Sequence, residues 1–552
     1  MISVSLSNVS LILGAHPIFK NLTWSIQHDQ KIGLIGPNGA GKSSLLKLTT
    51  GEFTPEPGGA VIKAKGITLG YLAQQPEPVK NQTAFEAAME GNPRWAEITQ
   101  ELARIESSLE DPQVYNNTKS LSRALEEQQS LLDEYLALGG DNYPSRVREL
   151  LSGLGLAEIE FDKPVASLSG GQKKLVGLVR LLLARPAVLL LDEPDNHLDL
   201  AGKTFLEQLI VDYSGAVVIV SHDRYLLDAV VTHIAEMEDG KVFTYEGDYS
   251  SYIIEKEERL ARQEELYQIQ QREIARLEMA MKRYAMWVVQ NDKFASRLHA
   301  MEARLARVQK LERPVLERRR MGFEINGWRG SNKVLELVNL QKSFGGHQIL
   351  KDVSTLIQHG ERVGLIGANG AGKSVLLRLI LGLELPDDGD VKIGPSVTLG
   401  YYAQEHETLD PEQTLIDTVR RGIPANATMN EASAVAFLNR YLFSYRQVSQ
   451  PVKELSGGER SRLQLALLVL SGANFLLLDE PTNNLDIASA EVLENALSDF
   501  VGTVLVISHD RYFLDRTVNR ILVLEGGQLK EYQGGYSDYT LEVKSLRRKL
   551  RI

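Results

Sequence analysis

Short runs of consecutive apolar residues recur along the chain and predict buried strands. They occupy residues 32–35, 188–191, 216–220, 475–478 and 504–507. A run of four or five apolar residues without polar alternation is typical of a parallel strand that is covered on both faces. Helical patterns follow these runs, so the sequence predicts an α/β fold with parallel sheets.

A seven-residue repeat fills the middle of the chain. Apolar residues recur at Ile253, Leu260, Tyr267, Ile274, Met281 and Val288, and a second seam contains Leu298, Met301, Leu305 and Val308. Glu, Arg, Gln and Lys, which favour helices, surround both seams. The pattern predicts an antiparallel hairpin of two long helices, the first of roughly 30 residues or about 45 Å. The turn is expected near residues 289–296.

The chain contains two copies of one domain. Residues 31–43 read KIGLIGPNGAGKS, residues 362–374 read RVGLIGANGAGKS, and further motif pairs follow in the same order. Repeats of this kind decide the architecture. The predicted domains are a first copy over 1–253, the helical hairpin linker over 254–332, a second copy over 333–542 and a short basic tail over 543–552.

The first copy carries an insertion. Gln74 and Leu168 are 94 positions apart, whereas Gln404 and Leu455 are only 51 apart. The additional residues of the first copy fall within 95–138, a segment that contains no glycine and shows helical spacing of leucine and isoleucine. We expect two helices with a turn near Pro112, and we call this insertion the arm.

The composition excludes several classes of protein. Hydrophobic residues make up 43% and charged residues 24%, as in ordinary globular domains. The chain has no cysteine, which excludes disulfides, thiolate nucleophiles and cysteine-bound metals. No apolar run is long enough for a membrane span, and no signal peptide is evident. We therefore expect a cytoplasmic protein without a membrane partner.

Charge is distributed unevenly. The whole chain carries a net charge of −11, yet residues 281–320 hold eleven basic and four acidic side chains. Tyr284, Trp287 and Phe294 lie among them, near the expected turn. A basic island with aromatic rings is what RNA contact requires. The alternative is a solvated helical face whose rings pack within the hairpin. The tail at 544–551 is either a weak additional contact or a frayed terminus.

Both copies contain a phosphate-binding loop. Gly-x-x-x-x-Gly-Lys-Ser stands between a strand pattern and a helix pattern at 36–43 and at 367–374. Backbone N–H groups and the helix N-terminus would bind phosphates, the lysine would reach the β- and γ-phosphates, and the serine would ligate Mg²⁺. The candidate residues are Gly36, Asn38, Gly39, Gly41, Lys42 and Ser43, and then Gly367, Asn369, Gly370, Gly372, Lys373 and Ser374.

Acidic pairs end two of the predicted strands. Asp192 and Glu193 follow one run, and Asp479 and Glu480 follow the other. Ligands bind at the carboxyl ends of strands in open α/β sheets. The aspartates are expected to hold Mg²⁺, and the glutamates are expected to polarise the attacking water.

A histidine follows one further buried strand in each copy. His222 and His509 both lie 30 positions after the strand-end aspartate. A polar histidine at this place could sense a γ-phosphate, whereas a lone histidine is more often structural. Because the spacing is the same in both copies, it favours the role of γ-phosphate sensor for both histidines.

Leu-Ser-Gly-Gly opens a helix in each copy and forms a second anion-binding N-terminus. The residues are Ser169, Gly170 and Gly171 in the first copy and Ser456, Gly457 and Gly458 in the second. One phosphate cannot easily use two helix N-termini of the same small domain. We therefore expect each nucleotide to lie between the two copies.

Taken together, these motifs resemble those of ATP-binding cassette ATPases, present twice. Two cassettes on one chain with a linker of about 80 residues are similar to the ABC-F family, as are Asn196-His-Leu-Asp199 and Tyr-x-Gly-x-Tyr-Ser-x-Tyr at 245–252 and 532–539. The resemblance implies head-to-tail pairing, closure on ATP and opening on hydrolysis. It also implies that Gln74 and Gln404 contact the nucleotide and Mg²⁺.

The resemblance defines two composite sites. Site one combines the phosphate loop, Gln74, Asp192, Glu193 and His222 of the first cassette with Ser456, Gly457 and Gly458 of the second. Site two combines the second phosphate loop, Gln404, Asp479, Glu480 and His509 with Ser169, Gly170 and Gly171.

The resemblance also implies partners. These are the ribosome, at the exit-site region and rRNA of its large subunit, and peptidyl-tRNA. The protein would act as a monomer without an obligate protein partner, most like the translational-throttle branch. A ribosome-protection factor that confers antibiotic resistance is the main alternative. The energising subunit of a transporter and a DNA-repair ATPase are weaker ones, because no membrane domain is fused and no coiled coil interrupts a cassette.

Two departures from the family pattern separate the sites. Asp195 stands where the family has threonine, and it places an extra carboxylate near site one. Phe344 could stack on adenine in the second cassette, but the equivalent residue in the first is Leu13. We therefore expect the two sites to hydrolyse ATP unequally.

Overall fold

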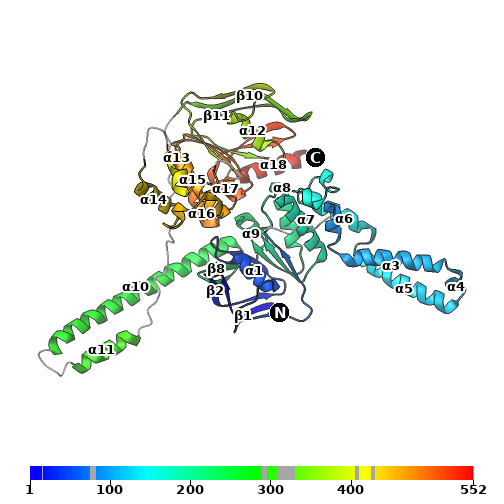
Figure 1. Ribbon diagram of the computed structural model, residues 1–552, viewed down its shortest axis with the longest axis horizontal. Helices are drawn as coiled ribbons and strands as arrows, with labels where there is room; N and C mark the ends of the chain where they lie inside the picture. The colour runs from blue at the N-terminus through cyan, green and yellow to red at the C-terminus, as the bar shows by residue number, and fades with distance from the viewer. Residues whose placement is uncertain are drawn as a thin grey trace.

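The computed structural model describes residues 1–14, 16–74, 82–288, 295–307, 330–403, 409–423 and 429–550. Each copy is an α/β domain around a six-stranded sheet (Figure 1). In order across the first sheet, the strands are β5 (Leu69–Leu72), β6 (Val188–Asp192), β7 (Ala216–Val220), β3 (Lys31–Ile35), β8 (His233–Glu238) and β9 (Lys241–Glu246). Only β9 pairs antiparallel.

The second sheet repeats this order. Its strands are β14 (Leu399–Tyr402), β15 (Phe475–Asp479), β16 (Thr503–Ile507), β12 (Arg362–Ile366), β17 (Arg520–Glu525) and β18 (Gln528–Gln533). The five apolar runs of the sequence form β3, β6, β7, β15 and β16, and all five strands are buried throughout. The α/β fold with parallel central strands is thereby confirmed.

Each cassette also has a three-stranded antiparallel sheet that the sequence analysis did not predict. In the first, β1 (Ile2–Leu13) lies between β2 (His16–Gln27) and β4 (Ala60–Lys63). In the second, β10 (Lys333–Phe344) lies between β11 (His347–Gln358) and β13 (Asp388–Ile393). These sheets enclose α1 (Lys42–Thr50) and α12 (Lys373–Ile380), the helices that follow the phosphate loops, in apolar cores.

Helices cover the other face of each parallel sheet. In the first cassette they are α2 (Ala84–Met89), α6 (Tyr143–Gly153), α7 (Gly170–Ala184), α8 (Leu200–Val211) and α9 (Arg224–Val230). In the second they are α13 (Leu415–Arg421), α14 (Glu431–Arg440), α15 (Gly457–Leu470), α16 (Ile487–Asp499) and α17 (Arg511–Thr517). Apolar side chains of these helices and of the sheet form the second core of each cassette.

The arm consists of α3 (Pro93–Leu109), the single turn α4 (Pro112–Tyr115) and α5 (Thr118–Ala137). Ile98, Leu102 and Leu131 form its small core. At its base, Trp95 stacks against Tyr143 with ring centroids 5.1 Å apart. The two expected helices are present, and Pro112 lies between them. Figure 1 shows the arm and the hairpin extending from opposite sides of the molecule.

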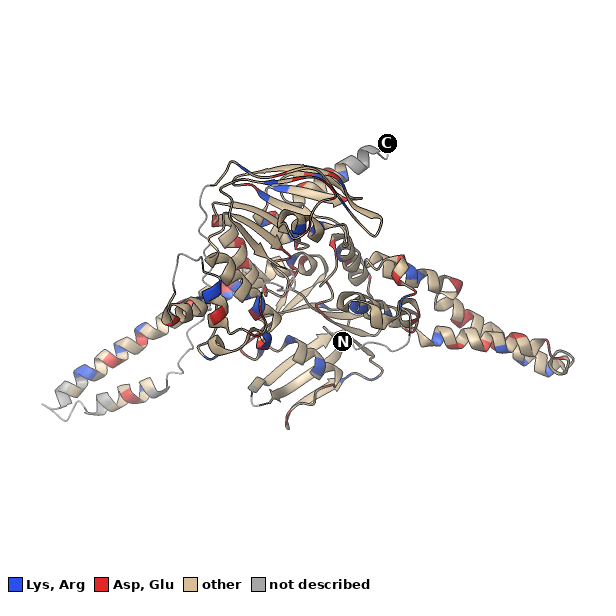
Figure 2. Ribbon diagram, turned by 45° about the horizontal axis from the view of Figure 1, so that its top comes forward, with Lys and Arg blue, Asp and Glu red and all other residues tan. Residues whose placement is uncertain are grey.

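The hairpin consists of α10 (Tyr249–Val288) and α11 (Ala295–Arg307). At 40 residues, α10 is longer than the expected 30, and the division placed at 253/254 falls inside it. Ile274 and Leu277 are buried between the helices, and Arg304 binds Glu273 across the pair at 2.9 Å. Charges of both signs alternate along the described helices (Figure 2). Of the turn expected near 289–296, residues 289–294 lie outside the described residues, as do residues 308–329, whereas residues 295 and 296 already belong to α11.

The last helix, α18 (Tyr536–Leu550), continues from the second cassette through most of the basic tail. Among the helices that the structure describes, none combines the length and the apolar character needed to cross a membrane.

Candidate nucleotide-binding site

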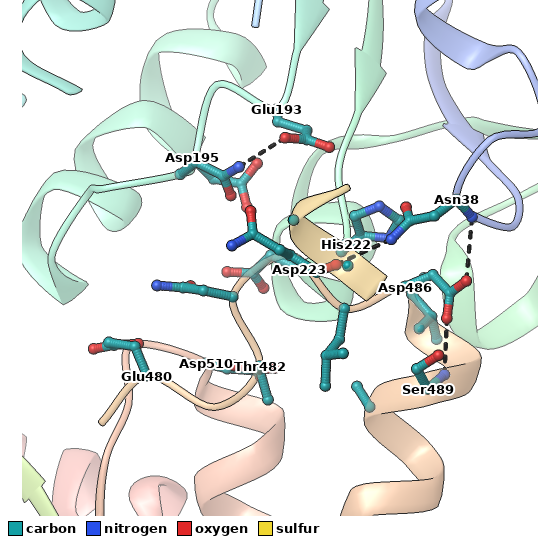
Figure 3. Close-up of a pocket in the computed structure, with 18 of the residues that line it drawn as sticks. Asn38, Glu193, Asp195, His222, Asp223, Glu480, Thr482, Asp486, Ser489 and Asp510 are labelled. Atoms are coloured by element: carbon teal, nitrogen blue, oxygen red, sulfur yellow. Dashed lines mark hydrogen bonds between the residues drawn. The ribbon is translucent and has the colours of Figure 1, made fainter. Parts of the chain in front are cut away.

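The two cassettes contact each other through their phosphate loops. The backbone N–H of Asn38 donates to Asp486 Oδ2 at 3.1 Å (Figure 3), and its side-chain amide donates to the carbonyl of Asn484 at 3.0 Å. The mirror contact joins Asn369 to Asp199 at 3.2 Å and to the carbonyl of His197 at 2.9 Å. Each phosphate loop therefore binds the loop that follows the acidic strand end of the opposite cassette.

One cavity contains nearly all of the predicted site residues. Both phosphate loops, both Ser-Gly-Gly motifs, Gln74, Phe344, both strand-end glutamates and both histidines line it. Asp192 and Gly367 are not in its wall, and Gln404 lies outside the described residues. The structure thus brings residues from both cassettes into one space, as a nucleotide sandwiched between them requires.

The glycines of the Ser-Gly-Gly motifs permit this close approach. A Cβ at Gly458 would lie 3.0 Å from the side-chain nitrogen of Asn38, in the opposite cassette. A Cβ at Gly171 would lie 2.9 Å from the Cβ of His197 in its own cassette, and the carbonyl of His197 is the group that accepts from Asn369 of the other cassette. Ser169 and Ser456 cap α7 and α15, and each forms a reciprocal capping box. The caps fix both helix N-termini toward the cavity.

The phosphate loops are tightly wound. Gly36 has φ of 150°, and a Cβ there would lie 2.4 Å from the carbonyl oxygen of Met237. Lys42 Nζ donates to the carbonyls of Gly36 at 2.8 Å and Pro37 at 3.1 Å. Lys373 makes the same pair of bonds in the second cassette. Burial lowers the pKa of both lysines, and nearby carboxylates oppose that shift.

The acidic strand end of the first cassette has a free coordination position. Asp192 is only 1% exposed, and its Oδ1 has no hydrogen-bond partner. Burial raises the pKa of Asp192, and its hydrogen bond with Ser43 opposes this. A buried carboxylate oxygen without a partner is costly. A divalent cation beside Ser43 would satisfy it, so these residues fit the expected Mg²⁺.

Glu193 is held from several directions. Gln74 Nε2 and Asn196 Nδ2 each donate to Glu193 Oε2 at 2.8 Å. Lys174 Nζ donates to the backbone carbonyl of Glu193 at 2.6 Å. Glu193 and its counterpart Glu480 have φ of 52° and 51°, so the chain turns sharply after each strand. These contacts aim the carboxylate of Glu193 into the cavity.

The two histidines differ in their contacts. His509 Nε2 lies 3.5 Å from Glu480 Oε1, and its backbone N–H donates to Glu480 Oε2 at 3.3 Å. Both ring nitrogens of His222 are buried and lack a hydrogen-bond partner. Burial, followed by the charge of Lys42, lowers the pKa of His222 to about 4. His222 is therefore neutral at pH 7, with both nitrogens available to a ligand.

The pKa of Glu480 leads to the first prediction. Burial, with the neighbouring Asp479, raises that pKa to about 7. A raised carboxyl pKa means that folding stability present at pH 5 is lost as the pH rises through 7. Glu480→Gln should therefore stabilise the nucleotide-free protein by about 1 to 3 kcal/mol at pH 8 and much less at pH 5. Thermal unfolding at both pH values measures this, and an equal gain at both would contradict it.

Adenine stacking is possible in only one of the predicted positions. Phe344 lines the cavity and is 45% exposed, and the ammonium of Lys342 lies 5.2 Å from the ring centroid. Leu13 is 39% exposed and is absent from the cavity wall. The structure therefore agrees with the expected difference in adenine stacking between the two sites.

Sequence reasoning missed a set of charged residues between the cassettes. Arg224 Nη1 donates to Glu494 Oε2 at 3.4 Å, its Nη2 donates to Oε1, and its guanidinium stacks on Tyr512 at 3.8 Å. The mirror pair is Arg511 with Glu207. The arginines belong to the sequence Ser-His-Asp-Arg-Tyr, which occurs at 221–225 and again at 508–512, but no local pattern marks their partners about 270 to 300 positions away.

Known proteins resemble this chain along its whole length. The ABC transporter family model matches residues 19–196 and 350–483, and a second ABC transporter model matches 235–325. The energy-dependent translational throttle protein EttA of Haemophilus influenzae is 38% identical over 535 residues, covering 95% of this chain and 92% of that protein. The putative ATP-binding protein YdiF of Bacillus subtilis is 36% identical over 544 residues, covering 98% and 83%.

Solved structures agree on the fold. The chain matches an archaeal ribosome recycling factor, aABCE1, solved with the stalk protein aP1, with a TM-score of 0.62 and 20% identity over 98% of this chain and 92% of that one. An RNase-L inhibitor matches with a TM-score of 0.60 and 19% identity over 98% and 93%. The chain therefore belongs to the ATP-binding cassette family, in its tandem-cassette ABC-F branch, and is an ATPase.

Proposed function

We propose that the protein is a translation factor that binds the ribosome while ATP holds its cassettes together, and that its hairpin then acts at the peptidyl-tRNA near the exit site of the large subunit. It works as a cytoplasmic monomer whose cassettes pair within the chain. EttA, which is similar over nearly the whole chain, is named a translational throttle. The basic island at 281–320 supplies the charge that RNA contact needs.

The attachment of the hairpin to the first cassette carries the proposal. Tyr249 and Tyr252, in the first turns of α10, are buried in the core of that cassette. Lys256 Nζ binds Glu236 of β8, and Arg259 lies 3.7 Å from the same carboxylate. β8 pairs with β3, the strand before the phosphate loop. The root of the hairpin is therefore rigidly connected to the part of the cassette that binds nucleotide.

The chemistry at each site follows from its residues. ATP lies between one phosphate loop and the opposite Ser-Gly-Gly motif. Mg²⁺ would be held by Ser43, Gln74 and Asp192 in site one and by Ser374, Gln404 and Asp479 in site two, and when bound it would neutralise the developing phosphate charge. Glu193 and Glu480 accept a proton from the attacking water, and the histidines orient the γ-phosphate.

Ribosome binding provides the test. The double variant Glu193→Gln, Glu480→Gln keeps ATP and stays closed, so we expect it to sediment with ribosomes through sucrose in ATP but not in ADP. Adding Lys293→Glu and Arg297→Glu, near the expected turn, should weaken this binding by roughly tenfold or more, because two attractive charges become repulsive.

A matched control separates the hairpin from general charge effects. Lys20→Glu with Lys65→Glu reverses two exposed charges on the first cassette and should leave sedimentation unchanged. Sedimentation that is equal in ATP and ADP, or absent in both, would refute an ATP-gated ribosome factor. Loss in both charge-reversal variants would refute the role of the hairpin.

A further inference from the structure

Three buried charges distinguish the first cassette from the second. Lys174, Asp195 and Lys203 are 4%, 6% and 8% exposed. At the equivalent positions of the second cassette, as set by the aligned motifs, the residues are Ser461, Thr482 and Ala490. Buried charges are kept only where they are paired or used. The three therefore mark a difference between the two composite sites.

Lys203 connects the cassettes. It lies on α8 of the first cassette, and its Nζ donates to Asp223 Oδ2 at 2.8 Å and to the backbone carbonyl of His509 at 2.9 Å. His509 belongs to the second cassette and lies beside Glu480. The mirror bond, from the second cassette to the carbonyl of His222, cannot form because Ala490 has no ammonium group.

Asp223 and Asp195 both supply negative charge near this lysine. Burial raises the pKa of Asp195, and the positive charge of Lys203 opposes that shift. Asp223 also lies 3.7 Å from Arg511 of the second cassette. Figure 3 shows Asp223 between the loops that carry Glu193 and Glu480. One ammonium thus neutralises acidic groups of its own cassette while it holds the backbone of the other.

We propose that Lys203 is a positioning residue for site two: from the first cassette it fixes the loop of His509 beside Glu480, and site one has no counterpart. Asp223, which accepts from Lys203 Nζ, is the partner that keeps this lysine charged in the interior, and the negative charge of Asp195 adds to that effect. The inference rests on the proposed roles of Glu480 and His509.

Turnover in single-site backgrounds tests the inference. Glu193→Gln leaves site two as the working site, and Glu480→Gln leaves site one. In the first background, Lys203→Met removes the ammonium but keeps the stem, and it should lower kcat about tenfold with little change in KM for ATP. The ratio of site-two to site-one turnover should fall by a similar factor. Lys241→Met, on the exposed strand β9, serves as the matched control.

A second variant excludes simple destabilisation. Asp195→Thr with Lys203→Ala gives the first cassette the residue pair of the second, and Asp223 keeps Arg511, 3.7 Å away, as a charged neighbour. Site-two kcat should stay low in this variant. Recovery of kcat, or an equal fall at both sites, would show that Lys203 only neutralises Asp195 and would overturn the proposal. Persistent hydrolysis after Glu193→Gln with Glu480→Gln would instead refute the assignment of the glutamates.

Discussion

Replacing both Glu193 and Glu480 with glutamine lowers steady-state ATP hydrolysis by about a thousandfold, since general-base assistance commonly contributes 10²- to 10⁴-fold. Glutamine has nearly the same shape, and its side-chain oxygen still accepts the hydrogen bonds that reach Glu193 from Gln74 and Asn196. ATP binding should therefore persist. Phosphate release at saturating ATP, with nucleotide affinity measured beside it, checks both parts.

The two single variants should differ. Site one carries the buried Asp195 and lacks an aromatic residue at position 13, whereas site two has Phe344 and the contact between His509 and Glu480. We expect Glu480→Gln to remove more of the total turnover than Glu193→Gln. Equal residual turnover in the two variants would refute the inequality of the sites, even if the double variant is inactive.

Removing Arg224 should prevent stable closure of the cassettes. Arg224 and Glu494 are 2% and 1% exposed as side chains and bind each other across the interface. Breaking a buried ion pair leaves an uncompensated charge and costs about 3 to 5 kcal/mol. Arg516 also reaches Glu494, at 3.3 Å, so the lower end of that range applies to Arg224→Ala. The ATP concentration needed for closure should rise by about a hundredfold.

Distance measurements between the cassettes can follow closure. The chain has no cysteine, so one introduced on each cassette accepts a fluorescent label without background. The control is Arg224→Leu with Glu494→Leu, which removes both charges and should close more readily than the single variant. Closure of Arg224→Ala at the wild-type ATP concentration would show that this ion pair does not hold the interface.

Local features were predictable from the sequence. The strands, the phosphate loops and the arm depend on residues close together in the chain, so periodicity and spacing reveal them. The antiparallel sheets had a signal that was not used, because Val4, Leu6, Val9 and Leu11 are buried at nearly alternating positions of β1. Their partly polar strands do not show the continuous apolar runs that mark the parallel strands.

Contacts between the cassettes could not be predicted in the same way. The partners of Arg224 and Lys203 in the second cassette lie hundreds of positions away, and only the packing of two folded domains selects them. The length of α10 was underestimated because its first residues belong to the tyrosine motif at 245–252, which lies outside the seven-residue repeat.

The anchored root of α10 has a mechanical consequence. A straight helix of 40 residues is about 60 Å long, so a rotation of 5° at its root displaces its far end by about 5 Å. Because Tyr249 and Tyr252 are packed into the first cassette, the helix must follow each rotation of that cassette. A small change of angle between the nucleotide sites thus becomes a far-end displacement of about one helical turn.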